Sequence, residues 1–242
     1  MTIRDKIRRD GCGRWLAKLL LIKIPLAFVA FTTLWVLVLK WVPVWVTPLM
    51  ISRSIEYRND KNFNTHKKWC SYEDISPELA KAVIASEDNL FAEHNGFDWK
   101  ELKKAISEHK EKGKRLRGAS TISQQTAKNV FLLPSKSFIR KVFEAYFTVL
   151  IEWIWGKERI IEVYLNVAEM GKGVYGAEAA AQEYFGKNAA GLTRRESSVI
   201  AACLPNPIDR HADRPSQYVS KRAGQIRALI PKLAYPEWIN HK

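Results

Sequence analysis

Two adjacent acids, Glu87 and Asp88, follow an apolar run within the stretch ASEDNLFAEHNGFDWK, residues 85–100. Glu87 falls on the same helical stripe as Leu79 and Val83, so its carboxylate is expected at the edge of a core. Burial there would raise the pKa of the acid toward the range that suits a general acid or base. A solvated acid at a helix end is the ordinary alternative, and this stretch alone favours that alternative.

A second polar stretch, GASTISQQTAKN, opens a predicted helix with hydrogen-bonding side chains. Exposed N–H groups at a helix start favour an anion, and amide side chains suit sugar hydroxyls. A polar surface helix is the alternative, although such helices are more often rich in Glu and Lys. The candidate substrate-binding residues in this stretch are Ser123, Gln124, Gln125, Lys128 and Asn129.

The stretch KSFIRKVFEA gathers cations just before an unusually apolar helix. Arg140 and Glu144 lie one turn apart, and as a surface ion pair they would contribute only about 0.3–0.5 kcal/mol. Lys136, Arg140 and Lys141 instead form a cationic cluster that, together with Lys128, could neutralise a diphosphate.

The two candidate catalytic acids are therefore Glu87 and Glu144. The candidate substrate-binding residues also include the cationic cluster and, separately, Asp88. Chemistry that joins a sugar to a lipid diphosphate would need this combination. A base activates the acceptor hydroxyl, and cations stabilise the departing diphosphate.

The start of the chain predicts a membrane anchor. Residues 1–18 form a basic tail and residues 19–42 an apolar segment, which is long enough for a bilayer core of about 30 Å. A cleaved signal peptide is the alternative, but the segment is long and no small-residue cleavage site follows it. The positive-inside rule then keeps the N-terminus in the cytoplasm and exports the rest. A net charge of +14 calls for an anionic partner, and export makes a membrane or a phosphorylated substrate more plausible than nucleic acid.

Helical periodicity dominates the exported part, so we expect a mainly α fold. Residues 43–75 are expected to form a membrane-proximal linker, polar and irregular beyond residue 52, and residues 76–242 a helical domain. Ser76 and Pro77 read as the N-cap and first residue of a helix. In the stretch STISQQTAKNVFLL, residues 120–133, three apolar residues are expected to point inward: Ile122, Val130 and Leu133.

Three further patterns carry little weight. GKGVYG, residues 171–176, matches a dinucleotide fingerprint, but a helix precedes it where a strand is required. The histidines show no metal-ligand spacing, so no protein metal site is expected. Cys70 and Cys203 are either buried small residues or a disulfide, and the sequence leaves this open.

Four motifs in order resemble those of the monofunctional biosynthetic peptidoglycan glycosyltransferases of glycosyltransferase family 51. The same family supplies the glycosyltransferase domain of class A penicillin-binding proteins. The motifs are EDNLFAEHNGFD, GASTISQQTAKN, RKVFEA and IIEVYLN, within residues 70–210.

The resemblance implies a lysozyme-like helical fold and a single-pass protein of the bacterial inner membrane with its catalytic domain in the periplasm. It implies polymerisation of lipid II by inverting β-1,4 transfer, with release of undecaprenyl diphosphate. Glu87 matches the general base, and Glu144 a second essential glutamate of less settled role. Lys128, Lys136 and Arg140 match diphosphate-binding positions. A divalent cation, Mg²⁺ or Mn²⁺, often assists in this family, and other wall-synthesis or division proteins are possible partners.

Two alternatives stay open. A lysozyme-like lytic enzyme would also use a glutamate, but its leaving group is a sugar and needs no cationic cluster. A non-enzymatic scaffold for cell-wall partners would need neither the acids nor the cations.

Overall fold

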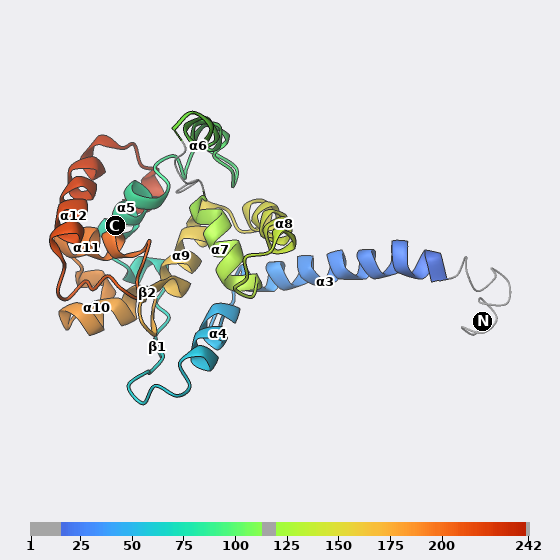
Figure 1. Cartoon of the computed structure of the whole chain (residues 1–242), viewed down its shortest axis with the longest axis horizontal. Helices are drawn as coiled ribbons and strands as arrows, with labels where there is room; N and C mark the ends of the chain where they lie inside the picture. Colours follow the sequence, from blue (N-terminus) through green and yellow to red (C-terminus); the bar gives the residue numbers. More distant parts are fainter. Residues whose placement is uncertain (1–15, 113–119, 241–242) are drawn as a thin grey trace. The chain divides into compact units, whose positions relative to one another are not determined.

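The computed structural model describes residues 16–112 and 120–240 (Figure 1). The chain divides into two compact units, Met1–Val42 and Pro43–Lys242. The fold class is the predicted one: mainly helical, with one apolar N-terminal helix and little sheet.

The N-terminal unit contains α3, Ile24–Leu39, which a π-helical turn at Leu19–Lys23 precedes. The continuous helix Leu16–Leu39 has 24 residues and a mean hydropathy of 2.1, so by length and composition it can cross a membrane. At 1.5 Å per residue it is about 36 Å long. Its one buried hydroxyl, on Thr32, donates to the Phe28 carbonyl at 2.8 Å, so the helix satisfies this polar group internally.

The larger unit is built from helices with a small sheet at one side. Its helices are α4 (Pro48–Glu56), α5 (Pro77–Glu87), α6 (Trp99–Lys112), α7 (Ile122–Phe131), α8 (Phe138–Ile154), α9 (Lys157–Val167), α10 (Ala177–Phe185), α11 (Arg194–Cys203) and α12 (Gln217–Leu229). Its strands are β1 (His66–Lys67), β2 (Glu169–Gly171) and β3 (Val174–Tyr175). Single 3₁₀ turns at Tyr72–Asp74, Ala189–Gly191, Ile230–Lys232 and Glu237–Asn240 complete the unit.

Helices α5, α11 and α12 pack against one another and form one part of the core (Figure 1). α5 begins where predicted, because the Ser76 hydroxyl accepts a hydrogen bond from the Glu78 N–H and Pro77 is the first helical residue. Leu79 and Val83 are fully buried. The same stripe therefore carries Glu87, at the last turn, to the edge of the core.

Helix α7 packs between α8 and α9 and forms the other part of the core. Phe131 of α7 stacks on Phe147 of α8, with ring centroids 4.4 Å apart and planes within 5°. Aromatic stacking of this kind adds about 0.5–1.5 kcal/mol beyond area burial. The packing fixes the rotation of α7, and with it the direction of its polar face.

Two predictions about secondary structure are wrong. Leu133 is 67% exposed rather than buried, because α7 ends at Phe131 and the backbone is extended at Leu132, ahead of Pro134. Part of residues 52–75 is ordered rather than irregular: it contains the end of α4 and strand β1, which pairs in parallel with β3.

The GKGVYG stretch forms the hairpin of β2 and β3 and the start of α10, so it is not a dinucleotide fingerprint. Gly176 has φ +83°, and a Cβ there would lie 2.6 Å from the Asn166 carbonyl oxygen. The glycine is thus required by close backbone packing. Cys70 and Cys203 are both free thiols.

Candidate active site

Glu87 is the last residue of α5, and its carboxylate is held by neutral donors. The Gln125 amide donates to Glu87 Oε2 at 3.1 Å, and the Ser86 hydroxyl donates to Oε1 at 3.4 Å. Burial raises the pKa of the Glu87 carboxyl, although both hydrogen bonds and the charge of Arg222 oppose the shift. A raised pKa makes this carboxylate a better acceptor for a hydroxyl proton.

Asp88, beside it, is buried and already engaged. Its Oδ2 accepts a hydrogen bond from the Ile122 N–H at 3.0 Å, and His94 Nε2 lies 2.9 Å from Oδ1. Asp88 therefore joins the end of α5 to the start of α7. These contacts favour a supporting role for this predicted substrate-binding residue.

The start of α7 is closed by the protein's own side chains. Thr121 and Gln124 form a capping box, with the Thr121 hydroxyl accepting from the Gln124 N–H and the Gln124 side chain accepting from the Thr121 N–H. The expected anion site at this helix start is therefore occupied by Thr121 and Asp88. Ser123 is fully buried and donates to Glu152 Oε1 of α8 at 2.5 Å, so it also faces away from solvent.

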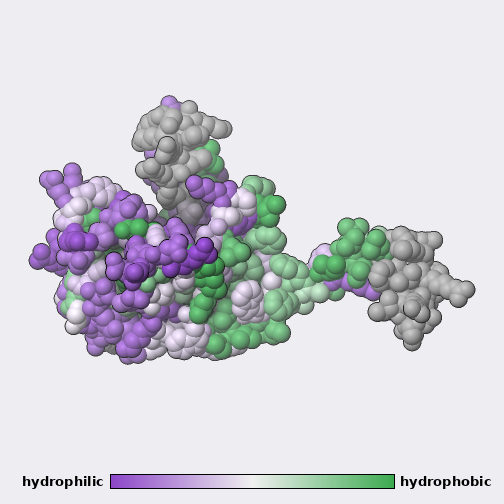
Figure 2. All heavy atoms as spheres, turned by 60° about the horizontal axis from the view of Figure 1, so that its bottom comes forward, coloured by the Kyte–Doolittle hydropathy of each residue, from purple (hydrophilic) through white to green (hydrophobic). Residues whose placement is uncertain are grey.

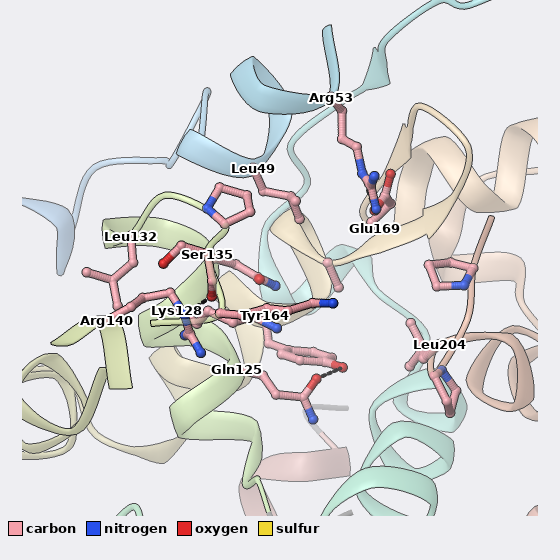
Figure 3. A pocket seen from close by; sticks show the side chains of 16 residues that line it. Leu49, Arg53, Gln125, Lys128, Leu132, Ser135, Arg140, Tyr164, Glu169 and Leu204 are labelled. Carbon is pink, nitrogen blue, oxygen red and sulfur yellow. Dashed lines mark hydrogen bonds and ion pairs between the residues drawn. The ribbon is translucent and has the colours of Figure 1, made fainter. Parts of the chain in front are cut away.

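Three other polar residues of α7 share a face that lines a cavity of about 580 Å³ (Figure 3). Gln125, Lys128 and Asn129 lie there at i, i+3 and i+4, and Lys136 and Arg140 line the same cavity. Burial lowers the pKa of Lys128, while the charge of Glu144 opposes that shift. The size suits a small-molecule or headgroup site.

Glu144 of α8 is buried between two cations. Arg140 Nη1 donates to its Oε2 at 2.5 Å, and Lys141 Nζ donates to its Oε1. The Arg140 Nε group also donates to the Ser135 carbonyl at 2.6 Å. Glu144 thus fixes the guanidinium that faces the cavity, whereas Lys141 contacts Glu144 without lining the cavity.

Glu87 lines a second cavity of about 310 Å³, together with Asp88, Thr121 and Arg222. Its hydrogen bond to Gln125, which lines the larger cavity, connects the two linings. Glu87 and the cationic residues of the larger cavity are therefore linked through one helix, α7.

Sequence reasoning missed most of the lining of the larger cavity, including its three other ionisable residues: Arg53, Tyr164 and Glu169. Tyr164 is buried, and its hydroxyl donates to Gln125 Oε1 at 3.3 Å, which orients the amide toward Glu87. Arg53 Nε lies 3.3 Å from Glu169 Oε2. Tyr164 belongs to the IIEVYLN motif and could have been considered, but Arg53 lies outside every motif.

The cavity does not present the ligands of a resident divalent cation. Among the residues that the structure describes, no group of three His, Cys, Asp or Glu side chains could hold a metal ion. The Glu144 carboxylate faces Arg140 and Lys141, and Asp88 is held by His94 and a backbone N–H. These residues do not fit a protein-held Mg²⁺ or Mn²⁺.

The chain is similar in sequence to known proteins of one family. A transglycosylase family model matches residues 54–230, well over half of the chain. A biosynthetic peptidoglycan transglycosylase of Bacteroides thetaiotaomicron is 56% identical over 84% of this chain and 82% of its own length. Those of Pseudomonas entomophila and Caulobacter vibrioides are 50% and 48% identical, over 84% and 88% of this chain and 86% and 92% of their own lengths. The chain therefore belongs to the transglycosylase family.

Proposed function

We propose that this protein polymerises lipid II into linear peptidoglycan strands by inverting β-1,4 glycosyl transfer. The observation that carries the proposal is the joint geometry of α7. Gln125 of this helix binds the carboxylate of Glu87, and Lys128, one turn on, lines the cavity with Lys136 and Arg140. Through Gln125 and Lys128, α7 thus contacts both the proposed base on α5 and the proposed diphosphate site.

In this proposal Glu87 removes the proton from the 4-hydroxyl of the acceptor GlcNAc. The hydroxyl oxygen attacks C1 of the donor MurNAc, and the bond between C1 and the diphosphate oxygen breaks with inversion at C1. The diphosphate leaves with the electron pair, and Lys128, Lys136 and Arg140 stabilise its charge. Glu144 holds Arg140 and Lys141 in place for this step.

Two amide side chains complete the proposed substrate site. Asn129 and Gln125 line the cavity and offer donors to sugar or phosphate oxygens. Ser123, Gln124 and Asp88 support the site from behind, because their side chains are bound within the protein. Any divalent cation would be bound mainly by the substrate's own diphosphate.

The surface of α8 supports contact with membrane lipids. Figure 2 shows a contiguous apolar area on the larger unit. Five large side chains of α8 are more than half exposed: Phe138, Ile139, Val142, Val149 and Trp153. Exposed apolar patches of this kind mark interaction surfaces. A lipid-linked substrate would be reached most directly from such a surface.

We place the protein in the bacterial inner membrane with a cytoplasmic tail at residues 1–18, a spanning segment at 19–42 and the rest in the periplasm. The apolar helix Leu16–Leu39 supports the anchor, and the basic residues before it support the orientation. Residues 43–75 connect the anchor to the catalytic part at 76–242.

Incubation of the full-length protein with lipid II tests the proposal. We expect glycan polymer and free undecaprenyl diphosphate. Cleavage of preformed glycan without polymer would instead identify the lytic alternative, and neither product would favour a scaffold. Repeating the assay with EDTA shows whether a divalent cation is required.

A further inference from the structure

The larger cavity has a second cationic wall that the reaction scheme above does not use. Arg53 of α4 lines the cavity together with Lys128 and Arg140. Figure 3 shows Arg53 and Glu169 toward one side of the cavity and Arg140 toward another. Arg53 lies just outside the residues that match the family model, 54–230, so it belongs to the segment that follows the anchor.

Arg53 is held by two carboxylates. Its Nη1 donates to Glu56 Oε2 at 2.7 Å and its Nε donates to Glu169 Oε2 at 3.3 Å. Glu56 is half exposed, whereas the Glu169 side chain is 7% exposed and lines the cavity. A guanidinium has five N–H donors, so two carboxylates do not exhaust its capacity.

Glu169 is an unusual counter-ion for a site that binds anions. Burial raises the pKa of its carboxyl, and Arg53 and the Tyr175 hydroxyl oppose this shift. An anion that contacts Arg53 would compete with the Glu169 carboxylate for the guanidinium N–H donors. The Arg53 side chain is 24% exposed, so its guanidinium is accessible from the cavity that it lines.

The proposed reaction brings together two lipid-linked substrates, and each carries a diphosphate. In the scheme above, Lys128, Lys136 and Arg140 bind one of these two diphosphates. We propose that Arg53 binds the diphosphate of a lipid-linked substrate at a second position in this cavity, and that Glu169 is the counter-ion which that diphosphate replaces. This inference rests on the proposed function.

Substitutions of Arg53 and of Glu169 should change the affinity for diphosphate in opposite directions. Arg53→Gln should weaken the binding of inorganic diphosphate by the full-length protein about tenfold, the effect of one charge-assisted contact. Glu169→Gln should strengthen it, because Arg53 loses a competing carboxylate. Arg53→Lys should recover part of the affinity, since it keeps the charge but not the planar fork. Arg58→Gln, at an exposed arginine that does not line this cavity, should have no effect.

Calorimetric titration in detergent, with circular dichroism to confirm folding, measures these affinities. A decrease in affinity for both Arg53→Gln and Glu169→Gln, or no change for a folded Arg53→Gln protein, would overturn the inference. If Glu169→Gln does not fold, the Arg53→Gln and Arg53→Lys pair decides alone. If Arg53→Gln weakens and Glu169→Gln strengthens the binding of inorganic diphosphate, but the wild-type protein makes no polymer, only the proposed function is rejected.

Kinetics with lipid II and a preformed lipid-linked glycan identify which diphosphate Arg53 binds. A raised KM for lipid II at saturating glycan indicates the diphosphate of the acceptor. A raised KM for the glycan at saturating lipid II indicates that of the donor. Unchanged KM values for both substrates in Arg53→Gln would contradict binding by Arg53.

Discussion

Glu87 and Glu144 are the same residue type on two different helices, α5 and α8, and their surroundings differ in charge. Glu87 accepts hydrogen bonds from a neutral amide and a neutral hydroxyl. Glu144 is buried between Arg140 and Lys141. A carboxylate without a cationic partner is suited to take a proton, whereas one bound by two cations is suited to position them. This difference in electrostatic surroundings supports the different roles that we propose for the two glutamates.

Replacing the base should give the largest effect. We expect Glu87→Gln to reduce the rate of lipid II polymerisation about 10²–10⁴-fold, the range for general base catalysis, with thermal stability unchanged. Initial rates and a melting curve check this. A variant that retains more than a tenth of the activity would remove Glu87 from the role of base.

The diphosphate site should respond next. We expect Lys128→Ala to lower the rate about 10²-fold, because one preorganised cation near the developing charge is lost. Lys221→Ala, at an exposed lysine of α12, is the matched control and should be close to wild type. Equal effects of the two variants would contradict the assignment of Lys128.

Glu144→Gln should sharpen the comparison, because here activity and stability change together. Loss of the carboxylate leaves Arg140 and Lys141 without their partner, and we expect the free energy of unfolding to fall by about 1–3 kcal/mol. The rate should fall about tenfold, since Arg140 is no longer held toward the cavity. Chemical denaturation and initial rates measure both. A large loss of rate with unchanged stability would indicate a direct chemical role for Glu144.

The smallest effect concerns pH. Because the pKa of Glu87 is raised, activity should be lost, as pH falls, at a higher pH than for an ordinary glutamate. Ser86→Ala removes a hydrogen bond that lowers this pKa, so the acidic limb of the pH–rate profile should move to higher pH. A limb that moves to lower pH would contradict the geometry at Glu87.

Local patterns made much of this structure predictable. The stripe of α5 placed Glu87 correctly at the edge of the core, and Ser76 correctly began that helix. The capping box of α11, Thr193 with Glu196, is also as the sequence indicates. These features depend on residues within one or two helical turns, which is the range that periodicity describes.

The cavity was less predictable, because its walls come from distant segments. Arg53 and Glu169 are separated by 116 residues, and nothing in either local sequence indicates that they meet. The role of Gln124 could have been predicted. Thr121 and Gln124 have capping-box spacing, which indicates that the Gln124 side chain caps the start of α7. Ser123 could not, since its direction depends on how α7 packs against α8.

The exposed face of α8 also determines how the protein behaves once isolated. A shortened chain beginning at Pro43 would lose the apolar helix but would keep Phe138, Ile139, Val142 and Trp153 in contact with water. Such a chain would still adsorb to detergent micelles and self-associate without them. Removing the apolar helix therefore does not by itself yield a freely dispersed enzyme. Purification must supply detergent or lipid to cover the exposed face of α8.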